Sequence, residues 1–499
     1  MSRLQAIASL LLRLDRRSKA SLQEQLCQGL RQAISTGVLA PGTRLPSTRQ
    51  LASELAVSRT TVVASLLQLL EEGYLTARER SGTFVAEDAG RLAAAPAGGR
   101  PRASSDSPLR LSRRMTELER AWTEGVLPAP GARPRAFRLS RPALDHFPVR
   151  DWSRILSRRA ARISYAQLDY GEEAPELRSA IAQLVSSSRG MRVHADQVLL
   201  FTGSQRALEF AVGAVLDRGD KAWMEDPGYA GARGVLRAAG ASIISVPVDD
   251  QGLVVAEGVA RAKDARLAFT TPSCQFPLGV TMSLSRRQEL LRWADAANAC
   301  IVEDDYDCEF RYTGAPLAAL HGLDASHRVL YVNSFSRTMF PALRLGYLVA
   351  PERLAERLRR ARATLEEPLP SLVQLALVDF IAEGHFVRHL RKMKVLYRQR
   401  RDALLSAASA AGLHRLKVRR VESGLHAIAE LPEGVDAEAV CVAAARRGVE
   451  VLPLSRFSAD ARSAPAALVL GFGAVDPERA RDGMTGLVAA IDEVARTAR

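Results

Sequence analysis

The run Val329-Leu-Tyr-Val-Asn-Ser-Phe-Ser-Arg-Thr-Met-Phe-Pro-Ala-Leu-Arg-Leu-Gly-Tyr347 begins with four apolar residues and continues into a polar stretch. A short apolar run that is rich in β-branched and aromatic residues is typical of a buried strand. Five more such runs precede it: Val198–Phe201, Lys221–Met224, Ser242–Val246, Leu267–Phe269 and Cys300–Val302. From Phe137 onward the runs alternate with long amphipathic stretches of helical period. The alternation predicts an α/β fold in which helices cover both faces of a mostly parallel sheet.

The first 86 residues follow a different pattern. Apolar residues at helical spacing predict a helix over Leu22–Ile34, and two more helices should follow, the second from Arg59 to about Glu72. The first of these begins after Ser47 and the second after Ser58, because both serines suit the N-cap position. The stretch Tyr74–Val85 reads as two strands joined by a turn. Two short helices followed by a hairpin predict a winged helix-turn-helix.

The start of the last of these helices is the predicted DNA-reading element. It presents Ser58, Arg59, Thr60 and Thr61, where free N–H groups favour phosphate and Arg59 is long enough to reach a guanine edge. Residues 1–86 carry eleven Lys and Arg against six Asp and Glu, a net charge of +5 that suits a polyanion. The alternative reading is a generic helical hairpin whose charges face water.

Residues 87–135 are dominated by Ala, Pro, Gly, Ser and Arg, a composition that cannot bury a core. This stretch is predicted to be a flexible linker with one short helix around Met115–Trp122. The chain is therefore expected to have three parts: a head (residues 1–86), a linker (87–135) and a body (136–499).

Composition restricts the class of protein. The whole chain has a net charge of +14, which favours a polyanionic partner. Its five cysteines are scattered without zinc-ligand spacing, so we expect no metal and a reducing compartment. The apolar run Ile7–Leu12 is too short to span a bilayer, and no stretch of about 18 apolar residues occurs. We therefore predict a cytoplasmic protein without a membrane span.

Ordered motifs extend these predictions to known families. The head resembles the GntR-type winged helix in Pro41-Gly-Thr-Arg-Leu-Pro-Ser-Thr-Arg-Gln-Leu-Ala52, Val57-Ser-Arg-Thr-Thr-Val62, Glu72-Gly-Tyr-Leu75 and Ser81-Gly-Thr-Phe-Val85. The body resembles the aminotransferase domain of MocR/GabR regulators in Phe147-Pro-Val-Arg-Asp-Trp152, Asp226-Pro-Gly-Tyr229, Thr271-Pro-Ser-Cys-Gln-Phe-Pro-Leu-Gly279, Glu303-Asp-Asp-Tyr-Asp307 and Ser334-Phe-Ser-Arg-Thr338. The resemblance implies a winged helix-turn-helix linked to a fold-type I, PLP-dependent-transferase-like α/β body, where PLP is pyridoxal phosphate.

The resemblance also implies which residues meet DNA and ligand. The expected DNA-binding residues are Arg44, Ser47, Thr48, Arg49, Ser58, Arg59, Thr60, Thr61, Arg80 and Gly82. The expected cofactor- or effector-binding residues are Gly203, Ser204, Gln205, Tyr229, Asp304, Tyr306, Ser334, Arg337, Arg344 and Arg456. Each body residue taken singly is also compatible with an ordinary core residue or a buried ion pair.

A phosphate group would be held by the turn Gly203-Ser204-Gln205, which follows a strand and opens a helix, with help from Ser334 and Arg344. By the same resemblance, Tyr229 would stack on a pyridine ring and Asp304 would pair with its nitrogen.

Two further body residues would reach other parts of the ligand. Tyr306 would contact the hydroxyl of the ring, and Arg456 matches the arginine that takes a ligand carboxylate.

Three departures from the family pattern lie at this pocket. Arg337 stands where the family has the lysine that forms an imine with PLP, and a guanidinium keeps its proton and cannot form that imine. Cys274 replaces a histidine. The loop that begins at Tyr170 is shorter than usual, which puts in doubt the reach of Tyr170 into a neighbouring subunit.

The resulting hypothesis is a transcription regulator of the MocR/GabR type. It would bind a double-stranded DNA operator as a head-to-tail homodimer and sense a small effector, such as an amine, an amino acid or a PLP-like anion. No catalytic residue is expected, and PLP would bind without a covalent bond if it binds at all. Two alternatives stay open: a PLP-dependent aminotransferase fused to a DNA-binding head, and a repressor whose body only dimerises.

Overall fold

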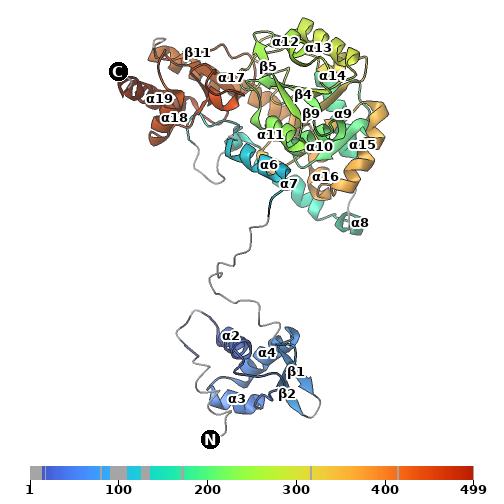
Figure 1. Cartoon of the computed structure of the whole chain (residues 1–499), viewed down its shortest axis with the longest axis vertical. Coiled ribbons are helices and arrows are strands. Elements are labelled where there is room, and N and C mark those ends of the chain that lie inside the picture. Colours follow the sequence, from blue (N-terminus) through green and yellow to red (C-terminus); the bar gives the residue numbers. More distant parts are fainter. Residues whose placement is uncertain are drawn as a thin grey trace. The chain divides into compact units, whose positions relative to one another are not determined.

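The computed structural model describes residues 14–16, 18, 20–78, 81–89, 110–124, 135–169, 173–314, 317–412 and 415–497. The chain divides into two compact units, Met1–Arg110 and Leu111–Arg499, and each is described by itself (Figure 1). The run Ile7–Leu12 and the residues Arg80 and Tyr170 lie outside the described residues.

The first unit contains the helices and the hairpin that the sequence predicts. Its elements are α2 (Leu22–Ser35), α3 (Thr48–Glu54), α4 (Arg59–Glu71), β1 (Leu75–Arg78) and β2 (Gly82–Val85). Ser47 and Ser58 precede α3 and α4, and each serine side chain accepts a hydrogen bond from a backbone amide of the first turn. Both predicted N-caps are confirmed. The strands β1 and β2 pair antiparallel as the wing.

One apolar core holds this unit together. Leu26 of α2, Leu51 of α3 and Leu66 of α4 are buried in it, together with Leu75 and Val85 of the hairpin. Because each element contributes to the same core, the exposed start of α4 is held on a rigid base.

The second unit is built on an eight-stranded sheet. Its strands are β3 (Val198–Phe201), β4 (Lys221–Asp226), β5 (Ser242–Asp249), β6 (Gly252–Leu253), β7 (Leu267–Thr270), β8 (Cys300–Asp304), β9 (Val329–Ser334) and β10 (Gly346–Val349). The spatial order is β3-β10-β9-β8-β7-β4-β5-β6. Neighbours from β9 to β5 are parallel, whereas β10 runs antiparallel to β3 and β9, and β6 to β5. The six predicted strands and the mostly parallel sheet are confirmed, and β6 and β10 were not predicted.

Helices cover both faces of this sheet. The helices of the sheet region are α7 (Val149–Ala160), α8 (Tyr165–Leu168), α9 (Pro175–Arg189), α10 (Ser204–Val215), α11 (Ala230–Ala239), α12 (Val255–Ala262), α13 (Leu284–Ala296), α14 (Leu320–Leu323), α15 (Glu352–Leu365) and α16 (Ser371–Ala382). In β3, Leu200 packs with the cluster of α7, α9 and α16, whereas Leu199 and Phe201 pack with that of α10 and α11. Alternate residues thus enter opposite cores, which makes the strand apolar throughout.

The C-terminal part adds a second, smaller sheet. Helix α17 (His385–Ala411) leads into four antiparallel strands, which are flanked by two more helices. These elements are β11 (Lys417–Val418), β12 (His426–Glu430), α18 (Ala437–Arg446), β13 (Leu452–Pro453), β14 (Ala467–Gly471) and α19 (Pro477–Thr497), with the strand order β11-β12-β14-β13. This sheet was not predicted from the sequence, because two of its strands have only two residues each and show no periodicity.

Part of the stretch predicted as a linker is helical. Helix α6 (Arg113–Glu124) includes the short helix expected around Met115–Trp122 and packs against α11 of the same unit (Figure 1). An ion pair between Arg114 and Glu209 joins α6 to the neighbouring helix α10 as well.

Candidate functional site

The start of α4 presents two side chains that no other described residue holds. Arg59 and Thr60 are exposed, and neither side chain hydrogen-bonds or pairs with another residue among those described. Ser58 and Thr61 hold each other instead: the Thr61 amide donates to Ser58 Oγ at 3.0 Å, and their hydroxyl oxygens lie 2.7 Å apart. Arg59 and Thr60 are thus available for base edges, whereas Ser58 and Thr61 fix the helix end.

Other expected DNA-binding residues lie at the start of α3 and at the wing. Ser47 caps α3, Thr48 is its first residue and Arg49 is exposed beside them. Gly82 opens β2 with φ +108°, and a Cβ atom there would lie 3.2 Å from Arg44 Nε. Glycine therefore allows both the backbone turn and the approach of Arg44 to the wing.

The wing also carries a basic residue that the sequence analysis missed. The Arg78 guanidinium lies over the Phe84 ring, 5.0 Å from its centroid. Arg78 and Phe84 lie on opposite strands, two positions apart in register, and a basic and an aromatic residue so placed in a predicted hairpin could have indicated this contact. By contrast, Arg31 of α2 is already neutralised by Glu72, with a closest N–O distance of 2.5 Å.

In the second unit, the expected phosphate-binding residues meet at one edge of the large sheet. Gly346 of β10 is in register with Phe201 of β3 on one side and with Ser334 of β9 on the other. Gly203, with φ +96°, leads directly into α10. A Cβ atom on Gly346 would lie 2.5 Å from the Gly203 carbonyl carbon and 2.7 Å from the backbone nitrogen at the start of α10. Because Gly346 has no side chain, the backbone of β10 can pack against the end of β9 and against the turn that leads from β3 into α10. The N-terminus of α10 that these segments surround is suited to an anion.

The cation expected at this anion site is free. Arg344 is exposed in a left-handed conformation (φ 52°), with one residue between it and the start of β10, and its side chain has no partner among the described residues. It lies two residues before Gly346 and is available for a phosphate oxygen.

Asp304 is a buried carboxylate at the end of β8, on the same edge. It is 6% exposed, and no donor in the part of the chain that the structure describes hydrogen-bonds to it. Burial, and then the nearby carboxylates of Asp305, Glu225 and Asp307, raises the pKa of Asp304 to about 7. Ionising a carboxyl group with so little access to water is costly unless a cation or donor meets it. A protonated ring nitrogen is the kind of partner that would relieve this cost, so Asp304 fits the role that the resemblance implies.

Tyr229 is fixed beside the start of α10. Its hydroxyl donates to Gln205 Oε1 at 3.1 Å, and the Gln205 amide donates to the Gly231 carbonyl at 2.9 Å. Burial, and then the Asp304 carboxylate, raises the pKa of Tyr229 to about 12, while the Arg337 charge acts in the opposite direction. Tyr229, Asp304 and Arg337 therefore share one electrostatic environment.

Arg337 is bound by Asp307 in a two-pronged ion pair. Arg337 Nε donates to Asp307 Oδ1 at 2.9 Å and Arg337 Nη2 donates to Oδ2 at 2.6 Å. Although burial lowers the pKa of Arg337, the Asp307 carboxylate holds it above its usual value, so the guanidinium stays charged. The third nitrogen, Nη1, is buried and has no partner among the described residues. Asp307 was given no role from the sequence, although it closes the motif Glu303-Asp-Asp-Tyr-Asp307.

Tyr306 and Cys274 form the wall beside this ion pair. The Tyr306 hydroxyl lies 3.8 Å from Cys274 Sγ, and the Arg337 guanidinium lies 6.0 Å from the centroid of the Tyr306 ring. A Cβ atom on Gly424 would lie 2.7 Å from Cys274 Sγ, so the C-terminal part closes tightly over the thiol. Burial, and then Asp307, raises the pKa of Cys274 to about 11, which keeps the thiol protonated at neutral pH.

Arg456 already has a carboxylate partner. It lies in a short 3-10 helix (Leu454–Phe457), where its side chain is 43% exposed and pairs with Glu438 of α18 at 3.1 Å. The neighbouring Phe457 ring packs against Phe276, with ring centroids 5.1 Å apart. The structure thus places Arg456 near the aromatic side of the pocket, in an exposed ion pair of the kind that contributes little to stability.

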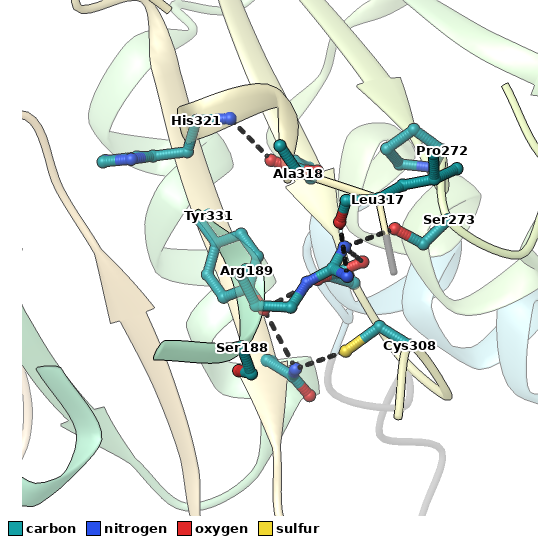
Figure 2. A network of polar contacts seen from close by, with 12 residues as sticks. Ser188, Arg189, Pro272, Ser273, Cys308, Leu317, Ala318, His321 and Tyr331 are labelled. Carbon is teal, nitrogen blue, oxygen red and sulfur yellow. Dashed lines mark hydrogen bonds and ion pairs between the residues drawn. The ribbon is translucent and has the colours of Figure 1, made fainter. Parts of the chain in front are cut away.

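Behind the pocket, a buried polar network supports the end of β8 (Figure 2). Arg189 donates to both Asp305 oxygens, at 2.7 and 3.0 Å, and to Ser273 Oγ at 2.7 Å. The Tyr331 hydroxyl donates to Asp305 Oδ2 at 2.8 Å. Figure 2 shows the Arg189 guanidinium pointing toward Ser273 and the Leu317 carbonyl, to which it also donates at 2.8 Å. The network holds Asp305, and so positions Asp304 next to it in sequence.

A cavity of about 260 Å³ lies elsewhere in the second unit, where α7 and α17 begin. Phe147, His385 and His389 are among its lining residues, and none of the expected ligand-binding residues lines it. Among the described helices, none is long and apolar enough to cross a membrane.

Comparison with known proteins matches both units. Residues 139–478 match the family of class I and II aminotransferases, and residues 22–85 match the bacterial regulatory proteins of the gntR family. Among solved structures, the chain is similar to the multiple substrate aminotransferase of Thermococcus profundus (TM-score 0.68, 26% identity, 79% of this chain and 98% of that one). It is also similar to a kynurenine aminotransferase of Pyrococcus horikoshii solved with PMP (TM-score 0.67, 25% identity, 77% and 95%).

Three relatives match over nearly their whole length. The probable rhizopine catabolism regulatory protein MocR of Rhizobium meliloti is 36% identical over 95% of this chain and 94% of that protein. The transcriptional regulator TauR of Rhodobacter capsulatus is 34% identical (95% and 97%), and the pyridoxine biosynthesis regulator PdxR of Corynebacterium glutamicum is 30% identical (95% and 97%). A gntR-type head fused to an aminotransferase-like body defines a class of transcription regulators. This chain belongs to that class, the MocR-type family.

Proposed function

We propose that the body of this regulator is a catalytically inactive sensor that holds a PLP-like anion without a covalent bond. The observation that carries the proposal is the ion pair of Arg337 with Asp307, at the position where the family resemblance expects an imine-forming lysine. A guanidinium stays protonated and cannot act as the nucleophile. The same position also lacks an amine that could move protons during amino transfer.

The remaining pocket residues support binding of a phosphorylated pyridine. The backbone at Gly203 and Gly346 with Arg344 would hold the phosphate, Asp304 would pair with the ring nitrogen, and Tyr229 would lie on the ring. When bound, PLP supplies an aldehyde and an electron-withdrawing ring, and here the residues would only retain it. One relative is named as a regulator of pyridoxine biosynthesis, which makes a ligand of this class the first candidate.

Ligand binding to the body would alter DNA binding by shifting the populations of two conformations of the regulator. A ligand shifts an equilibrium only by its difference in affinity for the two states. We propose that the chain forms a head-to-tail homodimer, and that occupation of the body favours one arrangement of the two heads on a double-stranded operator.

The test is PLP binding by the full-length protein, followed by borohydride reduction and peptide mapping. We expect saturable binding that dialysis reverses, and no pyridoxyl group on the peptide that contains Arg337. A reduced adduct in the pocket, or conversion of bound PLP to pyridoxamine phosphate (PMP) by an amino acid, would support the enzyme alternative instead. A complete lack of binding at millimolar PLP would favour a body that only dimerises.

A further inference from the structure

We infer that Arg337 makes this pocket select phosphorylated pyridines whose substituent at ring position 4 accepts a hydrogen bond, and reject those that carry an ammonium group there. The inference rests on the proposed function, because it assumes that the phosphate and the ring occupy the site described above. It adds a chemical class of ligand that the family membership does not specify.

The Arg337 side chain is held in place before any ligand arrives. Its two bonds to Asp307 use Nε and Nη2, and its side chain is only 14% exposed. A guanidinium fixed in this way by a carboxylate has little rotational freedom. Nη1 is left as a buried donor without a partner in the described structure. A buried donor of this kind gains most from a ligand that brings an acceptor.

Two neighbouring groups carry no charge that would compete with Arg337. Burial, and then Cys274 and Asp307, raises the pKa of Tyr306 well above its usual value, and the pKa of Cys274 is raised to about 11. Both groups therefore keep their protons at neutral pH. The Tyr306 hydroxyl already donates to Cys274 Sγ, so the strong donor that is left without a partner next to Arg337 is its own Nη1, and this donor favours an acceptor.

The carboxylates nearby do not offset this preference. Both Asp307 oxygens already accept hydrogen bonds from Arg337, and the Asp304 carboxylate is the partner expected for the ring nitrogen. Pyridoxamine phosphate carries an ammonium group on its position-4 substituent. This group has only hydrogen-bond donors, so it cannot accept from Arg337, and it places a second cation beside the guanidinium. The aldehyde of PLP and the hydroxymethyl group of pyridoxine phosphate both accept.

The experiment compares the equilibrium binding of these three phosphates to the full-length protein at neutral pH. We expect PLP and pyridoxine phosphate to bind at least about tenfold more tightly than pyridoxamine phosphate, the effect of roughly one buried hydrogen bond. Pyridoxine phosphate has no aldehyde, so its binding cannot come from imines with surface lysines.

Two variants distinguish the preference among the three phosphates from the overall affinity of the site for all of them. In the double variant Arg337→Gln/Asp307→Asn the ion pair is replaced by two neutral amides that both donate and accept, and the preference should fall to about twofold or less. Arg344→Gln is the matched control, because it removes an exposed, unpartnered arginine at the phosphate end. It should weaken all three ligands by a similar factor and leave their order unchanged.

The outcomes distinguish this inference from the proposed function. Equal binding of all three phosphates to the parent protein would overturn the role of Arg337 while leaving the phosphorylated-pyridine site in place. Persistence of the preference in the double variant would overturn it too. If none of the three binds, both the site and the inference are wrong.

Discussion

At the scale of single residues, an arginine and a lysine of equal charge differ in whether the proton can leave. Arg337 is paired with Asp307 and its pKa is held above the usual value, although burial acts in the opposite direction. Asp304, by contrast, is a buried carboxylate without a donor in the described structure. A cation that stays charged and an acid that is poorly satisfied are both expected where binding, more than stability, has shaped the site.

Arg337→Lys tests whether the pocket can return to covalent chemistry. The amine should attack the PLP aldehyde and form an imine with loss of water, because the phosphate cradle and Asp304 are unchanged. We expect a yellow adduct that borohydride reduces onto residue 337, identified by peptide mass. Arg337→Gln, which has no amine, should stay unlabelled. If Arg337→Lys also stays unlabelled at saturating PLP, residue 337 does not face the ligand.

Asp304→Asn should stabilise the unliganded protein in a pH-dependent way. The folded-state pKa of Asp304 is raised to about 7, above its unfolded value, so stability falls as pH rises between these two values. The asparagine removes this loss, and its advantage should be roughly 2–4 kcal/mol at pH 8 and fade toward about pH 4. Chemical denaturation at several pH values measures the difference. An advantage that is the same at pH 5 and pH 8 would contradict the raised pKa.

At the scale of elements, the first turn of α4 in the head both closes the helix end and leaves a basic residue exposed. Ser58 and Thr61 hold the first turn of α4 together, which leaves Arg59 and Thr60 free to face a partner. The wing repeats this arrangement, since Gly82 makes the turn and thereby lets Arg44 lie against it. In both places a structural residue keeps a basic residue exposed.

Arg59→Ala should weaken operator binding by roughly 1–3 kcal/mol and relax specificity at one base position, as expected for a two-pronged contact to guanine. Competition gel shifts with single-base operator variants give both quantities. Arg31→Gln is the matched control, because it removes the same charge from an arginine that Glu72 already neutralises. If Arg59→Ala reduces affinity equally for every sequence, Arg59 contacts phosphate and does not read a base.

At the scale of the whole molecule, each unit has its own apolar core, and the residues expected to bind a ligand all lie in the second unit. The core of the first unit extends to Ala89, which is fully buried, so residues 1–89 are expected to fold alone. A regulator that binds an operator with two half-sites needs two such units at a fixed spacing.

The full-length protein should therefore be a homodimer, and the isolated segment 1–89 should bind the operator much more weakly, because it loses the second contact. Light scattering at micromolar concentration measures the mass, and gel shifts at fixed salt measure the affinity. A monomeric full-length protein, or equal affinity of the isolated segment, would contradict this arrangement.

The sequence by itself determined the features that depend on local chemistry. Ser47 and Ser58 cap helices because a serine oxygen satisfies free amides within three residues, and six strands of the large sheet are recognisable as short apolar runs. Only the tertiary structure decided which distant side chains meet. Arg337 and Asp307 are 30 residues apart, and Arg189 and Asp305 are 116 apart. Their pairing follows from how the chain packs around the end of β8, and no local pattern encodes it. The same holds for β10, a four-residue strand that becomes visible only through its pairing with β3 and β9.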